Sequence, residues 1–303
     1  MSTSDALTRR SFLARTIQAS AVLAAGGAAT ATAATPWPPP IVVFSKLYQE
    51  LKLDYDKAAE ITAAAGLAGI DCPVRVKGEI EPEKAADEMP RYAGALRKRG
   101  VAMMLITSDL LSAESPHAEA VLRTAKKLGI GQYRLGFRRI PKTGGLDLNA
   151  IRAELKGLAA LNRAVGITGA IQNHSGAYVG GDLTQMHDLV KDFHPDEMGV
   201  AFDLGHAIVT HGADWPQHFD RLAPHIRIAY VKDVIPPKQW LALGKGEFEK
   251  ANWFPRVRKL NLRAPISLHI EYDWAAGAAK TYDGMLAALR ADTDTLKAWM
   301  AKA

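Results

Sequence analysis

Four consecutive apolar segments in the second half of the chain end in polar, titratable side chains. These endings are Gln172-Asn173-His174-Ser175-Gly176, Asp203-Leu204-Gly205-His206, Tyr230-Val231-Lys232-Asp233 and His269-Ile270-Glu271-Tyr272-Asp273. Side chains alternate along a strand, so residues two apart share a face. Pairs of this kind are Gln172 with His174, Tyr230 with Lys232, and His269 with Glu271. If these faces converge, the groups they bring together are those that general acid–base catalysis uses.

Side chains suited to binding a polar substrate occur near the same endings. Arg75 follows an earlier apolar segment and Arg134 lies within another. A guanidinium can hold a carboxylate or a pair of hydroxyls through two parallel hydrogen bonds, and the alternative role is a salt bridge on the rim. Trp274 directly follows the last ending. An aromatic ring at this place can stack on a bound ligand, and simple packing is the alternative.

The elements that position these residues are eight short, β-branched apolar segments, each followed by an amphipathic segment. The expected strands are 41–44, 67–71, 102–107, 132–135, 167–172, 199–203, 226–231 and 266–271, and the expected helices are 53–65, 82–99, 116–128, 148–164, 183–193, 215–222, 248–260 and 282–300. Eight βα repeats predict a single-domain α/β fold, a (β/α)8 TIM barrel over 41–303, with its active site at the carboxyl ends of the strands. A doubly wound open sheet is the alternative. No glycine-rich phosphate loop is present, so no nucleotide cofactor is expected.

The N-terminal segment has the pattern of an export signal. Arg9 and Arg10 precede an uncharged, Ala-rich stretch at 17–29, and small residues surround Ala33. The stretch is shorter than the roughly 20 residues of a membrane span. It resembles a twin-arginine signal, which implies a periplasmic or secreted protein without stable membrane insertion after cleavage. We expect residues 1–34 to be this signal and 35–40 to be a Pro-rich lead-in; an uncleaved helix is the alternative.

Composition excludes several other classes. The formal net charge is +6. Because the positive charges are scattered and form no basic stripe interleaved with aromatics, we expect no nucleic-acid partner. The single cysteine, Cys72, excludes an intramolecular disulfide and a CxxC metal site. The sequence leaves the oligomeric state open.

Several motifs together resemble one known family. They are Asn173-His174-Ser175-Gly176, Phe202-Asp203-Leu204-Gly205-His206-Ala207, Val231-Lys232-Asp233, Gly244-Lys245-Gly246-Glu247-Phe248 and Ile270-Glu271-Tyr272. In this order they resemble the xylose-isomerase-like TIM barrels, the sugar phosphate isomerase/epimerase group, which includes hydroxypyruvate isomerases, ketose 3-epimerases and inosose dehydratases. The resemblance implies one divalent metal ion, often Mn2+, held by Glu, Asp, His and Glu on strands five to eight. It also implies that the two Glu residues move protons.

This sequence keeps half of that ligand set. Asp203 and Glu271 fall on the aspartate and the second glutamate, whereas Gln172 and Tyr230 replace the first glutamate and the histidine. An amide cannot act as a base, and a neutral phenol is a poor ligand. We therefore expect a weakly held divalent ion on Asp203 and Glu271, assisted by water or a nearby histidine such as His206.

The resemblance and the residues together favour an enzyme that abstracts a proton next to the carbonyl of a sugar or sugar derivative. In this hypothesis Glu271 is the base, Lys232 stabilises the enediolate and His206 assists catalysis. The expected substrate-binding residues are Arg75, Arg134, Gln172, His174, His269 and Trp274. One alternative is a lyase or hydratase acting on keto-glycosides with the same chemistry. Another is a non-catalytic periplasmic carbohydrate-binding protein.

Overall fold

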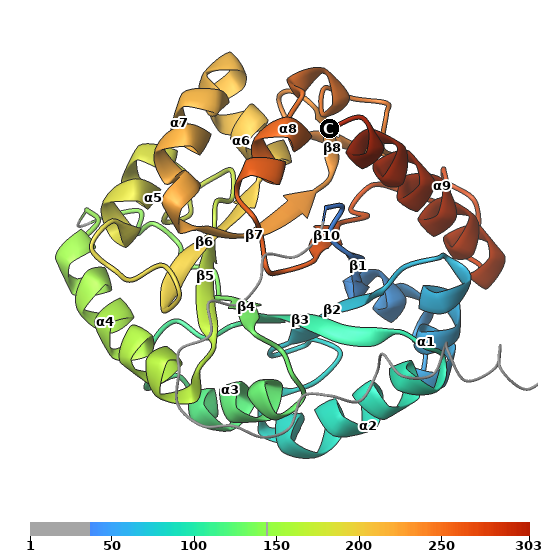
Figure 1. Ribbon diagram of the computed structural model, residues 1–303, viewed down its shortest axis with the longest axis horizontal. Coiled ribbons are helices and arrows are strands. Elements are labelled where there is room, and N and C mark those ends of the chain that lie inside the picture. Colours follow the sequence, from blue (N-terminus) through green and yellow to red (C-terminus); the bar gives the residue numbers. More distant parts are fainter. Residues whose placement is uncertain (1–36, 144) are drawn as a thin grey trace, which may run out of the picture. The chain divides into compact units, whose positions relative to one another are not determined.

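The computed structural model describes residues 37–143 and 145–303. The expected export signal and the first two residues of the lead-in lie outside this range. Eight parallel strands close into a barrel, with each strand beside the next in the chain and the last beside the first (Figure 1). They are β1 (Ile41–Phe44), β2 (Gly69–Val74), β3 (Ala102–Ser108), β4 (Gln132–Arg134), β5 (Thr168–Gln172), β6 (Met198–Asp203), β7 (Ile226–Val231) and β10 (Ile266–Leu268). The predicted (β/α)8 barrel is confirmed.

Helices surround the barrel (Figure 1). They are α1 (Tyr55–Ala64), α2 (Ala85–Lys98), α3 (Ala118–Lys127), α4 (Leu148–Val165), α5 (Leu183–Val190), α6 (Leu204–His211), α7 (Trp215–Leu222), α8 (Phe254–Lys259) and α9 (Tyr282–Ala301). Helix α4 shows how local sequence sets the ends. The Asp147 carboxylate accepts the first free backbone N–H groups, and Gly166 ends the helix at a φ of 78°. Both are standard capping devices.

Alternating residues of the strands build two apolar layers. One layer lies inside the barrel and consists of Val42, Leu105, Ala170, Ala201, Ile228, Tyr230 and Ala264. The larger layer packs between the strands and the helices and includes the neighbouring Val43, Ile106 and Phe202. Parallel strands covered by helices bury both faces, which explains the continuous apolar runs in the sequence.

Several elements differ from the sequence-based expectation. Strand β10 ends at Leu268 instead of residue 271. The expected helix at 248–260 is divided into a 3₁₀ turn, Glu249–Ala251, and the short α8, because Asn252 takes a left-handed φ of 49° between them. Helix α6 and an antiparallel hairpin, β8 (Asp233–Ile235) with β9 (Gln239–Leu241), were not predicted.

Asp233 fixes the loop that follows this hairpin. Its Oδ1 accepts hydrogen bonds from the backbone N–H groups of Val234 and Phe248, and its Oδ2 accepts from those of Gly244 and Gly246, all at 2.9 Å. A Cβ on Gly246 would lie 2.4 Å from Oδ1. The Gly-Lys-Gly-Glu-Phe motif is therefore a backbone cradle for one carboxylate.

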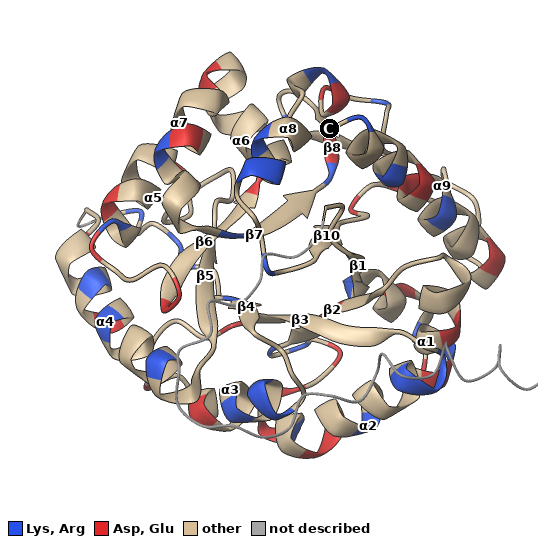
Figure 2. Ribbon diagram, viewed as in Figure 1, with Lys and Arg blue, Asp and Glu red and all other residues tan. Residues whose placement is uncertain are grey.

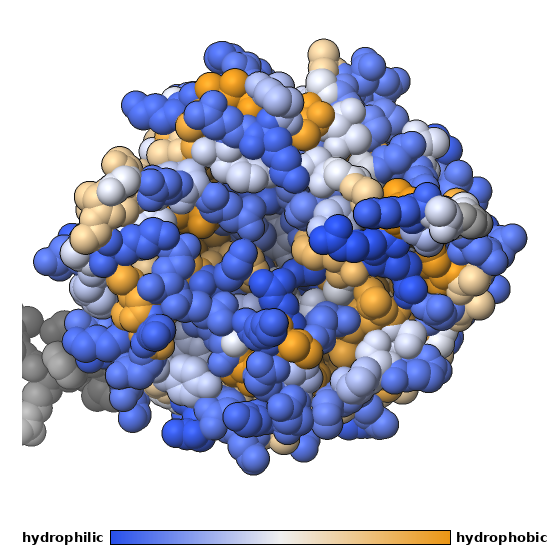
Figure 3. Space-filling model, turned by 180° about the vertical axis from the view of Figure 1, so that it is seen from behind, coloured by the Kyte–Doolittle hydropathy of each residue, from blue (hydrophilic) through white to orange (hydrophobic). Residues whose placement is uncertain are grey.

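The surface carries charges of both signs. Lys and Arg alternate with Asp and Glu around the outer helices (Figure 2). The face opposite to that of Figure 1 is mostly hydrophilic, with apolar residues in small, scattered groups (Figure 3). Within the described residues, no helix combines the length and the apolar character needed to cross a bilayer.

Replacing the Asp233 carboxylate is expected to destabilise the fold. Asp233→Ala leaves four backbone N–H groups without their acceptor. We expect the free energy of unfolding to fall by about 3 kcal/mol, since lost hydrogen bonds to a buried charge cost this order of magnitude. Urea denaturation measures the change. The matched control is Asp294→Ala on the exposed face of α9, and equal stability of the two variants would contradict the anchoring role.

Candidate active site

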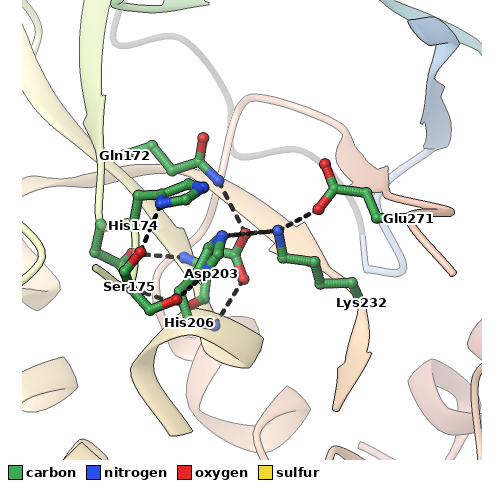
Figure 4. A network of polar contacts seen from close by, with 8 residues as sticks. Gln172, His174, Ser175, Asp203, His206, Lys232 and Glu271 are labelled. Carbon is green, nitrogen blue, oxygen red and sulfur yellow. Dashed lines mark hydrogen bonds and ion pairs between the residues drawn. The ribbon is translucent and has the colours of Figure 1, made fainter. Parts of the chain in front are cut away.

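The side chain of Lys232 lies at the centre of the polar cluster at the barrel mouth (Figure 4). It follows β7 and is 3% exposed. Its Nζ lies 2.8 Å from Glu271 Oε2, 2.8 Å from His206 Nε2 and 3.2 Å from Asp203 Oδ2. An ammonium group has three N–H donors. The three acceptors around Lys232 therefore saturate it.

Electrostatics keep this group charged. Burial by itself would lower the pKa of Lys232, but the carboxylates of Asp203 and Glu271 outweigh burial and raise the pKa above its ordinary value. Burial would likewise raise the pKa of Glu271, and the adjacent Lys232 instead holds that pKa well below the usual range. The Lys232–Glu271 pair is therefore ionised at neutral pH.

His206 is a neutral imidazole in one tautomer. Burial first, and then the charge of Lys232, hold its pKa far below the ordinary value. Since Nε2 accepts from the Lys232 ammonium, Nδ1 must carry the proton and donate to Ser175 Oγ at 2.8 Å. This tautomer follows from the hydrogen-bond partners.

The position of Asp203 depends on strand β5. Its Oδ2 accepts from Gln172 Nε2 at 2.9 Å, and its Oδ1 caps α6 by accepting from the backbone N–H of His206 at 3.1 Å. Asn173 bonds both backbone groups of Asp203, accepting its N–H at 2.7 Å and donating to its carbonyl at 2.9 Å. These bonds join the ends of β5 and β6, which gives Asn173 of the Asn-His-Ser-Gly motif a structural role.

Trp240 and Gly205 complete the surroundings of the ammonium. The Trp240 ring, on strand β9, has its centroid 4.4 Å from Lys232 Nζ, within the range of a cation–π contact. A Cβ on Gly205 would lie 3.1 Å from both Lys232 Cγ and the Trp240 ring. Gly205 therefore leaves the space that Lys232 and Trp240 fill. Sequence reasoning missed Trp240 because the hairpin that carries it gave no recognisable signal.

Two of the expected substrate-binding residues, His269 and Arg134, line the same barrel opening. His269 is 5% exposed and lies between the rings of Phe44 and Tyr230, with centroid distances of 4.8 and 4.4 Å. Neither of its ring nitrogens has a hydrogen-bond partner among the described residues. Burial, followed by Lys232, lowers the pKa of His269 to about 3. Arg134 is also buried and stacks on Phe137 at 4.2 Å.

His174 belongs to the central cluster through its ring. The ring lies 4.0 Å from that of His206, between centroids, and packs edge-on against Phe137 at 4.6 Å. Its Nδ1 lies 2.9 Å from the Ser175 carbonyl oxygen. Burial and the charge of Lys232 lower the pKa of His174 to about 4, so it is neutral at pH 7.

Two expected residues lie farther out. The Arg75 guanidinium lies over the Phe44 ring, 5.6 Å from its centroid, on the side of the mouth where Phe44 stacks on His269. Trp274 donates from Nε1 to Glu50 at 2.9 Å and is not joined to the Lys232 cluster by a contact between described residues. Its role as a sugar platform stays a prediction.

A further acid, the half-buried Glu79, was not expected from the sequence. Its carboxyl accepts hydrogen bonds from the hydroxyls of Ser45 and Tyr92 and from the Cys72 thiol. Burial raises the pKa of Glu79 to about 8, although these donors act in the opposite direction. The group is therefore mostly protonated at neutral pH. No periodic or motif signal marks it, because the turn at 75–80 folds it back beside β1.

The divalent site expected on Asp203 and Glu271 does not fit this arrangement. The structure brings the two carboxylates together, but the Lys232 ammonium occupies the point between them. Gln172 turns its amide N–H toward Asp203. Burial holds the pKa of the Tyr230 phenol well above its ordinary value, so it offers no phenolate ligand. Over the ranges that the structure describes, no three His, Cys, Asp or Glu side chains form a ready metal site.

Comparison with solved structures shows the same fold at low sequence identity. D-psicose 3-epimerase from Clostridium cellulolyticum H10 matches with a TM-score of 0.65 and 11% identity, over 86% of this chain and 99% of that one. The IOLI protein with a bound zinc atom matches with 0.67 and 13%, over 87% and 98%. The 3-keto-D-glucoside 4-epimerase from E. coli matches with 0.61 and 12%, over 88% and 100%.

Family comparison adds the sequence evidence. No curated protein sequence matches the chain. The model of the family described as "Xylose isomerase-like TIM barrel" matches residues 59–292, which is most of the barrel and includes all four polar strand endings. The chain therefore belongs to the xylose isomerase-like TIM barrel family.

Proposed function

We propose that this protein is an isomerase- or epimerase-like enzyme that abstracts a proton next to the carbonyl group of a sugar or sugar derivative. The observation that carries the proposal is Glu271, a carboxylate held ionised against Lys232 at the barrel mouth, with its side chain 28% exposed. The family supports a carbohydrate substrate, and two of the structural neighbours are named as sugar epimerases.

The contacts of Glu271 suggest how it would act. Oε2 accepts from Lys232, whereas Oε1 has no hydrogen bond to another described residue. Oε1 is therefore the atom that takes a proton from the substrate carbon, and the positive charge of Lys232, 2.8 Å from Oε2, stabilises the developing enediolate oxygen electrostatically. A positioned cation at such an oxygen is a large contribution to rate.

The polar groups of the barrel opening would bind the substrate. His269 is buried with no partner for either ring nitrogen among the described residues, Arg134 is buried, and Arg75 lies beside them. Hydroxyl groups and carboxylates of a sugar derivative complement donors of this kind. Gln172 and His174 complete the proposed binding set, on the side of the Asp203 carboxylate.

The amide of Gln172 supports the lyase or hydratase alternative. Gln172 replaces the carboxylate that the family resemblance implies on β5, so the site has one carboxylate base at the positions that move protons. Removal of one proton followed by loss of a leaving group needs only one such base, as does transfer between neighbouring carbons on one face. A keto-glycoside would therefore suit this site. The non-catalytic binding protein is the remaining alternative.

Exchange of carbon-bound hydrogen tests the role of Glu271. In D2O, wild type is expected to exchange hydrogen in at least one compound of a panel of ketoses, 3-keto-glycosides and 2-keto acids. Glu271→Gln should lower the exchange rate by about 10²-fold or more, the usual contribution of a positioned general base. The matched control, Glu83→Gln, alters an exposed carboxylate outside the site and should exchange at the wild-type rate.

Two results would contradict this assignment. Equal exchange by wild type and Glu271→Gln would remove Glu271 as the base. Measurable sugar binding without exchange of any compound would favour the carbohydrate-binding protein.

The pH dependence provides a separate prediction. Lys232 keeps the pKa of Glu271 below its ordinary value, and the carboxylates keep the pKa of Lys232 above its own. The base therefore stays ionised as the pH falls, and the ammonium stays protonated as the pH rises. We expect the kcat/KM of exchange to be flat between about pH 5 and pH 9. A profile that falls below about pH 6.5 would contradict Glu271 as the base.

We also propose that the protein is exported through a twin-arginine-type signal. The support is the sequence pattern of Arg9 and Arg10 before an uncharged stretch. Replacing both residues by lysine should leave full-length precursor in the cytoplasm, because the receptor reads the arginine pair. Cell fractionation with immunoblotting measures this, with Arg15→Lys as the matched control. An unchanged periplasmic yield of the double variant would refute the proposal.

A further inference from the structure

We propose that the Lys232 ammonium takes the place of the divalent cation in this site, so that the reaction proceeds without a metal ion. The inference rests on the proposed function for its chemistry, but its structural part concerns cation binding alone. Asp203 Oδ2, Glu271 Oε2 and His206 Nε2 all lie within 3.2 Å of Lys232 Nζ. Two oxygens and one nitrogen are the donors that a divalent transition metal takes.

Two differences from the implied metal site, Gln172 in place of a glutamate and an ammonium in place of a divalent ion, cancel in charge. Compared with the ligand set that the family resemblance implies, Gln172 removes one negative charge. An ammonium in place of a divalent ion removes one positive charge. The net charge of the cluster is therefore the same in both arrangements. Gln172 also donates to Asp203 at 2.9 Å, which a second carboxylate at that position could not do while ionised.

Packing holds the ammonium at this point. Lys232 is 3% exposed, and the Trp240 ring closes the cluster on one side. Gly205 leaves room for the aliphatic stem, since a Cβ there would lie 3.1 Å from Lys232 Cγ. Tyr230 lies on β7, two residues before Lys232, where the resemblance implies a histidine ligand. An ammonium needs no such ligand, because its three donors are already used.

The step balances without a metal or a redox partner. The substrate C–H bond breaks, its proton goes to Glu271, and its electron pair forms the carbon–carbon double bond of the enediolate. The carbonyl π electrons move to oxygen, and the adjacent Lys232 ammonium stabilises the negative charge that develops there. Return of the proton from Glu271 to the former carbonyl carbon, with transfer of the hydroxyl proton of the deprotonated carbon to the former carbonyl oxygen, yields the isomer and regenerates Glu271. The cation only has to stabilise one developing negative charge, which a buried ammonium can do.

Manganese binding tests the inference without any substrate. Full-length chains are dialysed against a chelator, and Mn2+ binding is followed by the loss of the free-ion signal in electron paramagnetic resonance. Lys232→Ala exposes the three acceptors, so it is expected to bind one Mn2+ at least roughly tenfold more tightly than wild type, because a neighbouring positive charge is removed. The control Lys238→Ala removes an exposed positive charge on the nearby hairpin and should behave like wild type.

A double variant ties the new site to these residues. Lys232→Ala with Asp203→Asn should lose the gained Mn2+ binding, because one ligand is now neutral. If Lys232→Ala does not fold, as judged by circular dichroism, Lys232→Gln removes the same charge with less loss of volume. One equivalent of Mn2+ bound tightly by wild type would overturn the inference, and so would folded Lys232 variants that bind Mn2+ no better than wild type.

Activity measurements separate this inference from the proposed function. Wild-type exchange in D2O should be unchanged by chelator, and added Mn2+ should restore part of the rate lost in Lys232→Ala. Exchange that chelator abolishes in wild type would overturn the inference and leave the function intact. If no compound exchanges while the Mn2+ results are as expected, the proposed function fails and the cation replacement stands.

Discussion

A buried ammonium surrounded by its own acceptors organises this protein. Lys232 carries a positive charge into the barrel mouth, where an unpaired charge would be too costly to keep. Asp203 and Glu271 neutralise it, and His206 takes its third donor. Each of the three contacts that stabilise Lys232 also helps to hold its partner in place. The protonation states of two of them follow as well, since the charged Lys232 lowers the pKa of Glu271 and helps burial to lower the pKa of His206.

Hydrogen bonds between neighbouring strand ends and loops hold the site residues in place. Asn173 joins β5 to β6 through the backbone of Asp203. One residue after Lys232, the Asp233 carboxylate gathers four backbone N–H groups of the following hairpin and loop. The two residues that follow β7 thus have different roles. Lys232 points into the site, and Asp233 fixes the loop beside it. The hairpin in turn places Trp240 against the ammonium.

Family membership establishes the fold of this chain, whereas the proposed reaction depends on the residues of its site. The family model covers 59–292, and the neighbours share the barrel at 11 to 13% identity. Similarity at this level of sequence identity shows the shared fold alone. The proposed chemistry rests instead on the side chains of this chain's own site, where Gln172 and Tyr230 replace two implied ligands and Lys232 lies between two carboxylates.

The sequence by itself determined the barrel, because eight apolar runs with intervening amphipathic segments have few other ways to bury both faces of parallel strands. It also determined which strand endings meet, since the carboxyl ends of such strands share one rim; hence Asp203, Lys232 and Glu271 were expected together. Only the tertiary structure decided that Asp203 and Glu271 both contact Lys232, and that Trp240 joins them. These contacts depend on side-chain direction and on distances of a few tenths of an ångström between strands, and periodicity carries no information about either.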